Sequence, residues 1–379
     1  VLTKLFATTG IAVLDLPAVT VEAVQTGHAV LKSGKKLEIV RFPASLQADL
    51  LRYAKENGAE AVLISGDAFD SDRPAMRDKQ LFYRAVEAHK ELTFFYLRGN
   101  HDAKEENSLT EDLPNLFTFG NEWTTYSFRG VNITGAEWHA ENAEKLYASL
   151  SLPENGVNIV LLHGDIGGEI DLRRLKEKNI DYLALGHIHS FSEGKIDERG
   201  TYAYSGCLEG RGYDECGKKG FVLLNVIPQD PGGMGAKNAA GGEKKISVAF
   251  VPSSIREITE YRVDVSAAKN DYEAREIVRR AVVSPQKDMV RVYLTGEVGF
   301  DRRALEKSVS ESLSGRYYYA SVKDETRAKC DFAAYAAENN SLKGEFVRLT
   351  LAREDLTAEE KDAVIRLGIN VLENGEAEL

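Results

Sequence analysis

Four short polar motifs in this chain each follow an apolar run, and this arrangement constrains the fold more than any other feature of the sequence. The motifs are GDAFD (66–70), GNHD (99–102), His163 in LLHGD, and GHIH (186–189). The runs before them, AVLIS, FFYL, IVLL and YLAL, have the length and composition of buried strands. Because ligand sites in open α/β sheets gather at the carboxyl ends of strands, we expect the motifs to meet at one rim.

The fold class that this alternation predicts is α/β. From about residue 44 to 226, helical patterns such as SLQADLLRYAKENG and a helix over 74–90 alternate with strand-like runs. Beyond about residue 262 the motifs stop, but periodic segments continue. We expect helices near 271–283, 302–313 and 357–367, and strands near 289–296 and 345–351. We therefore predict one domain over 1–262 and a smaller C-terminal α+β domain over 263–379, as a chain of this length allows.

Composition places the chain among ordinary globular proteins. Hydrophobic residues make up 43% and charged residues 28%, and no window approaches the roughly 18 apolar residues of a membrane span. The N-terminal VLTKLFATTGIAVLDL lacks a clear cleavage site and is not interpreted as a secretory signal. The three cysteines have no CxxC spacing, which argues against disulfides or a zinc-thiolate site. A soluble protein of the reducing cytoplasm is the expectation.

The net charge of -11 bears on possible partners. Sequence-independent affinity for nucleic acids comes mainly from lysines and arginines that neutralise phosphates, so this charge disfavours tight DNA binding by the chain alone. It is compatible with a catalytic subunit in which metal ions supply positive charge locally and a partner supplies the main binding surface.

The residue types in the motifs suit metal-dependent phosphodiester hydrolysis. Two cations roughly 3.5–4 Å apart can generate the nucleophile, neutralise the phosphoryl oxygens and help the leaving group depart. A carboxylate such as Asp67 can bridge two cations, and imidazole and amide ligands complete shells that suit manganese, iron or zinc. A turn after Gly186 would let the rings of both His187 and His189 address such a site.

Each motif, taken singly, can also be explained by a structural role that involves no metal. A single HxH is more often structural than metal-binding, GNHD can be an ordinary turn, and GDAFD can cap a helix. Four such motifs in this order, each after an apolar strand, favour the metal site.

The four motifs resemble the calcineurin-like metallophosphoesterase superfamily, whose fold is a sandwich of two β-sheets flanked by helices. The resemblance implies divalent metal ions, two in the family and manganese by preference. It implies that Asp67 bridges both ions and that Asn100, His163 and His187 complete the second metal site. His189 is similar to a ligand of the first metal.

Two further residues of GNHD carry catalytic expectations from the same resemblance. His101 is similar to the histidine that contacts the scissile phosphate. Asp102 would orient or electrostatically support that imidazole, as a third group commonly does for a catalytic base or acid.

Within the superfamily, the chain is most similar to bacterial DNA-repair exonucleases of the SbcD type. The segments that carry this similarity are YSGCLEGRGYDECGKKGFVLLNV, SVAFVPSSIREITEYRVDVS, VRVYLTGEV and SLKGEFVRLTL. The similarity implies DNA as substrate and an SMC-like ATPase subunit as partner, and it allows a homodimer. The rival interpretations are a small-molecule or nucleotide phosphodiesterase or phosphatase, and a non-catalytic structural or regulatory subunit.

The N-terminus departs from the family pattern. The family opens with Asp-x-His, both ligands of the first metal, whereas TGIAVLDLP (9–17) places Ile11 and Val13 at those positions. Neither side chain can coordinate a cation. Three explanations are open. Asp15 or His28 supplies the missing ligands, or the first metal site is weak or absent. The third is that a local error in reading frame changed the sequence of the first forty residues. We favour an incomplete first site.

The segment GYDECGKK (212–219) comes close to a phosphate-binding GxxxxGK loop. Lys219 stands where Ser or Thr would hold magnesium, and the following FVLLNV is strand-like although that loop needs a helix. We therefore predict no nucleotide site here, and inert thiols at Cys207, before this segment, and Cys216, within it.

Overall fold

The structure is a computed structural model of the 379-residue chain. It describes residues 28–30, 36–38, 58–68, 76–100, 102, 113–226, 246–338 and 340–374. The chain divides into two compact units, residues 1–259 with 286–289, and residues 260–285 with 290–379. The predicted helix before Gly58, the predicted loop over 228–245, and the positions of Ile11, Val13 and Asp15 lie outside the described residues.

A three-stranded sheet in the first unit carries the first two motifs. Its strands β3 (Ala61–Ser65), β4 (Thr93–Leu97) and β5 (Leu116–Thr118) are parallel, in the order β3-β4-β5. Helix α2 (Met76–Ala88) connects β3 to β4, as a parallel pair requires. Its Phe82 and Val86 are fully buried in one core cluster with Phe94 of β4. The predicted strands AVLIS and TFFYL, and the helix between them, are confirmed.

A six-stranded sheet carries the other two motifs, in the order β10-β11-β9-β8-β7-β6. The inner pairs β7–β8, β8–β9 and β9–β11 are parallel, whereas the edge pairs β6–β7 and β10–β11 are antiparallel. The bounds are β6 (Thr124–Phe128), β7 (Val131–Gly135), β8 (Val157–His163), β9 (Tyr182–Gly186), β10 (Ser192–Lys195) and β11 (Thr201–Tyr204). Helix α3 (Ala143–Ser149) and the 3-10 turn η3 (Leu172–Leu175) pack on its outer face.

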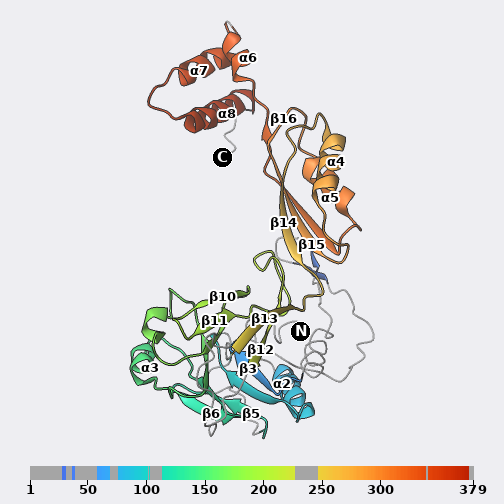
Figure 1. Ribbon diagram of the computed structural model, residues 1–379. Coiled ribbons are helices and arrows are strands. Elements are labelled where there is room, and N and C mark those ends of the chain that lie inside the picture. The colour runs from blue at the N-terminus through green and yellow to red at the C-terminus, as the bar shows by residue number, and fades with distance from the viewer. Residues whose placement is uncertain are drawn as a thin grey trace, which may run out of the picture. The chain divides into compact units, whose positions relative to one another are not determined.

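The two sheets pack face to face. Alternate side chains of each strand point to opposite faces, so Val62 packs toward α2 while Leu63 points into the core between the sheets. There it joins Phe95 from its own sheet and Leu161 and Ala184 from the other. The first unit is thus the predicted sandwich of two sheets flanked by helices (Figure 1). The four strands that precede the motifs, β3, β4, β8 and β9, are buried on both faces, which explains their uninterrupted apolar runs.

Two short antiparallel pairs complete the description of the first unit. Strands β1 (His28–Val30) and β2 (Lys36–Glu38) form one. Strands β12 (Gly220–Val226) and β13 (Ile246–Pro252) form the other, and Val222 and Ile246 bury their side chains between the two sheets. No helix of the described residues is long and apolar enough to cross a membrane.

The second unit contains an α+β core followed by a helical segment. The sheet β14-β15-β17 packs one face against helices α4 and α5 through Val278, Val292, Leu294 and Val309. The bounds are α4 (Asp271–Ala281), α5 (Leu305–Leu313), β14 (Ile258–Asp264), β15 (Met289–Thr295), β17 (Tyr319–Asp324), the short pair β16 (Glu297–Val298) and β18 (Arg327–Ala328), α6 (Phe332–Ala337), α7 (Leu342–Leu351) and α8 (Ala358–Asn374). The predicted domain boundary at 262 falls within β14, the strand that leads from the first unit to the second.

One predicted element is wrong. The segment 345–351 was expected to be a strand, but it belongs to helix α7. Ser341 caps this helix by accepting a hydrogen bond from the backbone N–H of Gly344 at 3.2 Å. Val347 then buries its side chain against Ile365 and Ile369 of α8. The short β-branched and apolar run EFVRLTL has strand propensity, but the cap and the packing on α8 decide in favour of a helix.

Candidate metal centre

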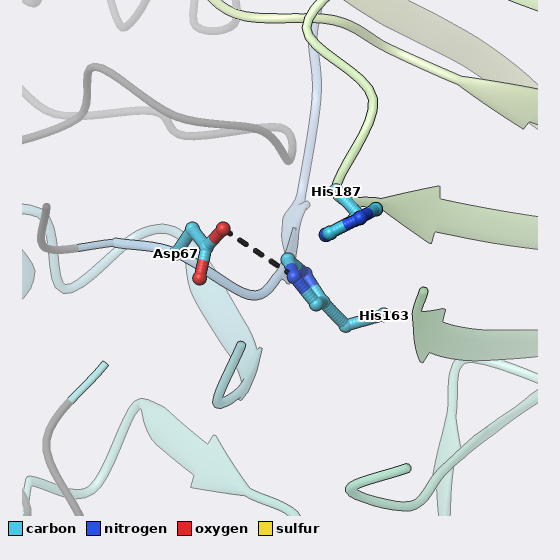
Figure 2. Close-up of side chains that lie close together, drawn as sticks. All are labelled: Asp67, His163 and His187. Carbon is cyan, nitrogen blue, oxygen red and sulfur yellow. Dashed lines mark ion pairs between the residues drawn. The ribbon is translucent and has the colours of Figure 1, made fainter. Parts of the chain in front are cut away.

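The ends of four strands bring four of the predicted residues together at one rim. Asp67 and Asn100 follow β3 and β4, His163 ends β8, and His187 follows β9. Ligand atoms of Asp67, His163 and His187 all lie within 4.8 Å of one another, and Figure 2 shows these side chains grouped around the His163 ring. Asn100 joins them, because its Oδ1 lies 2.8 Å from His163 Nε2 and 3.3 Å from His187 Nδ1.

The buried ring of His163 is oriented by the backbone. Its Nδ1 donates to the carbonyl oxygen of Ser65 at 2.8 Å, which leaves Nε2 to face the other groups. Asp67 Oδ2 lies 3.3 Å from this Nε2. Burial by itself would lower the pKa of His163, but the hydrogen bond and charge of Asp67 outweigh it and raise that pKa.

Three acceptor atoms therefore converge, namely Nε2 of neutral His163, Oδ2 of Asp67 and Oδ1 of Asn100. Such atoms repel one another unless a proton or a cation lies among them. The pKa of His163 is raised for the same reason, because the nearby carboxylate of Asp67 stabilises a positive charge at this position. One carboxylate, one amide oxygen and imidazole nitrogens are a donor set that suits a divalent transition metal. The residues thus fit the cation that their types predicted.

The backbone at two of these residues is strained. Asp67 has φ of 54° and His187 has φ of 97°, in the left-handed region that residues with a Cβ rarely adopt. The turn predicted after Gly186 is therefore present. Strain of this kind persists only where the surroundings enforce it, and it collects at functional sites.

Glycines next to these residues allow the strands to approach so closely. A Cβ at Gly99 would collide with the side chain of Asp67, and a Cβ at Gly186 would collide with the carbonyl oxygen of Ser65. Both glycines immediately precede a predicted ligand. The glycines of GNHD and GHIH are thus required by close packing of the rim.

The remaining predicted residues lie differently. His189 is not in the group of Asp67, His163 and His187, and its Nδ1 lies 2.6 Å from Glu215 Oε1. Asp102 is buried and closes the GNHD turn by accepting a hydrogen bond from Gly99 N–H at 2.9 Å. Burial, together with the charge and hydrogen bond of Asp102, raises the pKa of Tyr96. His101 lies outside the described residues, so its contact with phosphate and its support by Asp102 stay predictions.

Comparison with known proteins bears on the first unit. Residues 43–191 match the family model of calcineurin-like phosphoesterases. The match supports membership of that superfamily. It covers all seven predicted site residues, from Asp67 to His189, and the family implies metal-dependent hydrolysis of phosphoesters with divalent cations. No curated protein matches the chain.

Sequence reasoning missed an ion pair at the rim of the two-sheet sandwich. Arg98, just before GNHD, donates two hydrogen bonds to Glu137, from Nε at 2.5 Å and from Nη2 at 2.7 Å. Glu137 is buried and follows β7 of the other sheet. The pair therefore ties the two sheets together at the ligand rim. Glu137 also lies just beyond the end of a strand, after Gly135 and Ala136, which is the kind of position that identified the ligands.

Sequence reasoning also missed the contacts that the loop between β11 and β12 makes with His189. As predicted, GYDECGKK leads into a strand and not into a helix. Lys219 is buried, and its Nζ donates to the carbonyl oxygen of His189 at 2.7 Å. Burial by itself would raise the pKa of Glu215, but hydrogen bonds from His189 and Arg211 and the charge of Arg211 hold it at about 2. Two buried charged residues of this loop, Glu215 and Lys219, therefore contact His189.

Cys207 of this loop is expected to be inert in the folded protein. Its side chain is buried, and burial raises the pKa of its thiol to about 12. Because the thiolate is the reactive form, we expect iodoacetamide at pH 8 to label Cys207 at least about a hundredfold more slowly than half-buried Cys216. Peptide mass spectrometry over time measures the rates, and denatured protein should label both alike. Equal rates in the folded protein would contradict this burial.

Proposed function

We propose that the chain is a metal-dependent phosphodiesterase that hydrolyses DNA at its ends. The observation that carries the proposal is the convergence of His163 Nε2, Asp67 Oδ2 and Asn100 Oδ1 at the ends of three strands. Divalent cations held there would lower the pKa of water and neutralise the phosphoryl oxygens. We propose manganese as the cation, because mixed nitrogen and oxygen ligands suit it.

The residues of the chain have distinct tasks in this proposal. Asp67, Asn100, His163 and His187 would hold one cation. The strained backbone at Asp67 and His187 and the close packing at Gly99 and Gly186 fix the positions of these side chains before substrate arrives. Asp102 fastens the GNHD turn through Gly99, so that His101 can be presented to the scissile phosphate. His189 and the bridging Asp67 contribute to the other cation.

The first cation site is expected to be the weaker of the two. Ile11 and Val13 stand where the family has Asp-x-His, so this site lacks two ligands unless Asp15 or His28 replaces them. Calorimetric titration with manganese should therefore give one tight and one weak binding event. Two equally tight events would contradict the incomplete site.

A gain-of-function variant also tests whether the first cation site is incomplete. Replacing Ile11 by Asp and Val13 by His restores the family pattern and should raise manganese-dependent hydrolysis. No increase would indicate that Asp15, His28 or another group already supplies the missing ligands.

An SMC-like ATPase is the partner that we propose for the second unit. The net charge of -11 makes tight DNA binding by this chain alone unfavourable, so a partner must supply much of the DNA affinity. Helices α7 and α8 expose large apolar side chains, including Leu342, Leu349, Val364 and Val371. Exposed apolar surface of this kind supports a protein-binding role.

The test of the proposed function compares two substrates in the presence of manganese. A linear DNA duplex labelled at its ends should be degraded, and the reaction should stop when the metal is chelated. Hydrolysis of a chromogenic phosphodiester without any cleavage of DNA would favour the alternative that the acidic charge supports, a small-molecule phosphodiesterase. Failure with both substrates would support a non-catalytic subunit.

A further inference from the structure

The loop from Cys207 to Lys219 holds His189 from two directions. Glu215 contacts the ring, with Oε1 at 2.6 Å from Nδ1. Lys219 contacts the backbone, with Nζ at 2.7 Å from the His189 carbonyl oxygen and at 3.2 Å from Ser190 Oγ. The backbone N–H of Cys207 also donates to the His189 carbonyl oxygen, at 3.4 Å. Main chain and ring of this histidine are therefore both fixed.

The two charged groups that hold His189 are buried, which is costly unless each is fully hydrogen-bonded. Glu215 is 4% exposed and Lys219 is 1% exposed. Glu215 already accepts hydrogen bonds from Arg211, at Oε2 from the backbone N–H at 2.8 Å and at Oε1 from Nη2 at 3.2 Å. It does not depend on His189 for a partner, yet its contact with His189 is the shortest of the three.

The contact determines which nitrogen of His189 carries the proton. A carboxylate only accepts hydrogen bonds, so Nδ1 must be the donor, and Nε2 of the neutral ring keeps its lone pair. Carboxylates that hold metal-binding histidines act in this way, fixing the tautomer and making the free nitrogen a better ligand. His189 keeps 30% of its side chain exposed, so its ring remains accessible.

We propose that Glu215 is a positioning residue that fixes the tautomer and orientation of His189, so that Nε2 is offered to a divalent cation. Lys219 supports the same arrangement through the backbone. The metal-binding half of this inference rests on the proposed function, whereas the tautomer is a property of the metal-free chain.

The experiment measures the imidazole ¹⁵N shifts of His189 by NMR in the full-length, metal-free chain. At a pH high enough that the imidazole ring is neutral, the wild type should show a protonated Nδ1 and an unprotonated Nε2. Glu215→Ala should give a mixture of tautomers, and Glu215→Asp should restore at least part of the wild-type pattern. A control is Glu209→Gln, since Glu209 is similarly buried but its carboxylate accepts hydrogen bonds from the backbone N–H groups of Ile255 and Arg256, away from His189.

Manganese binding by the same variants provides the second readout. We expect Glu215→Ala to weaken one binding event by about 10- to 100-fold, with Glu209→Gln unchanged. A wild-type His189 protonated on Nε2, or a tautomer that Glu215→Ala leaves unchanged, would overturn the positioning role. The wild-type spectrum decides this even if Glu215→Ala does not fold. If the wild type binds no manganese, the proposed function fails, and the tautomer still decides the role of Glu215.

Discussion

Replacing Asp67 by asparagine is expected to lower metal-dependent hydrolysis by about a hundredfold to a thousandfold, the usual loss when a central electrostatic group is removed. The reason is local. Asp67 supplies the only carboxylate in the group with His163 and His187, so the variant keeps the shape of the site but loses its negative charge. Initial rates with a phosphodiester substrate at saturating manganese measure the effect.

The control for Asp67→Asn is Glu198→Gln, which removes one negative charge from an exposed position of the same unit, away from the loop that contacts His189. It should keep wild-type rates and manganese affinity. Asp67→Asn should unfold cooperatively like the wild type while its manganese affinity drops, which separates loss of the site from loss of the fold. Wild-type manganese affinity in Asp67→Asn would show that the cation binds elsewhere.

Gly186→Ala is expected to damage both the fold and the site. The added Cβ would overlap the carbonyl oxygen of Ser65 and lie 2.7 Å from His163 Nδ1. Since the first of these atoms belongs to the backbone of a buried strand, relief requires the two sheets to move apart. Overpacking of this kind costs about 1–3 kcal/mol, and the shift would also break the hydrogen bond from His163 to Ser65.

Denaturant unfolding and manganese titration together test Gly186→Ala. The midpoint of unfolding should fall, and manganese affinity should fall with it in the fraction that remains folded. Gly120→Ala is the matched control, because a Cβ at Gly120 meets no atom within 4 Å. Wild-type stability and metal affinity in Gly186→Ala would mean that the rim is not packed as closely as described.

The centre of the sandwich was predictable from the sequence because the strands that precede the four motifs are buried on both faces. Such strands appear as uninterrupted apolar runs, and a polar motif directly after each run marks the rim. The strand ends at Ser65, Leu97, His163 and Gly186 fall at the motif boundaries. This part of the site needed only local sequence and the geometry of parallel sheets.

Local sequence could not identify the partners of these motifs. Glu215 and Lys219 reach His189 from a loop that resembles a failed nucleotide-binding motif, and nothing in its spacing points back to GHIH. Arg98 and Glu137 come from different sheets, so their pairing depends on how the sheets are stacked. The strand predicted over 345–351 failed for a related reason, because packing of Val347 on α8 outweighs local propensity.

Anomalous scattering from crystals soaked in manganese tests the central claim most directly. We predict a strong peak within about 2.0–2.3 Å of ligand atoms from Asp67, Asn100, His163 and His187. A second, weaker peak is expected about 3.5–4 Å away, on the side of His189. Strong peaks elsewhere with none among these four side chains would contradict the assignment of the strand-end motifs to a metal centre.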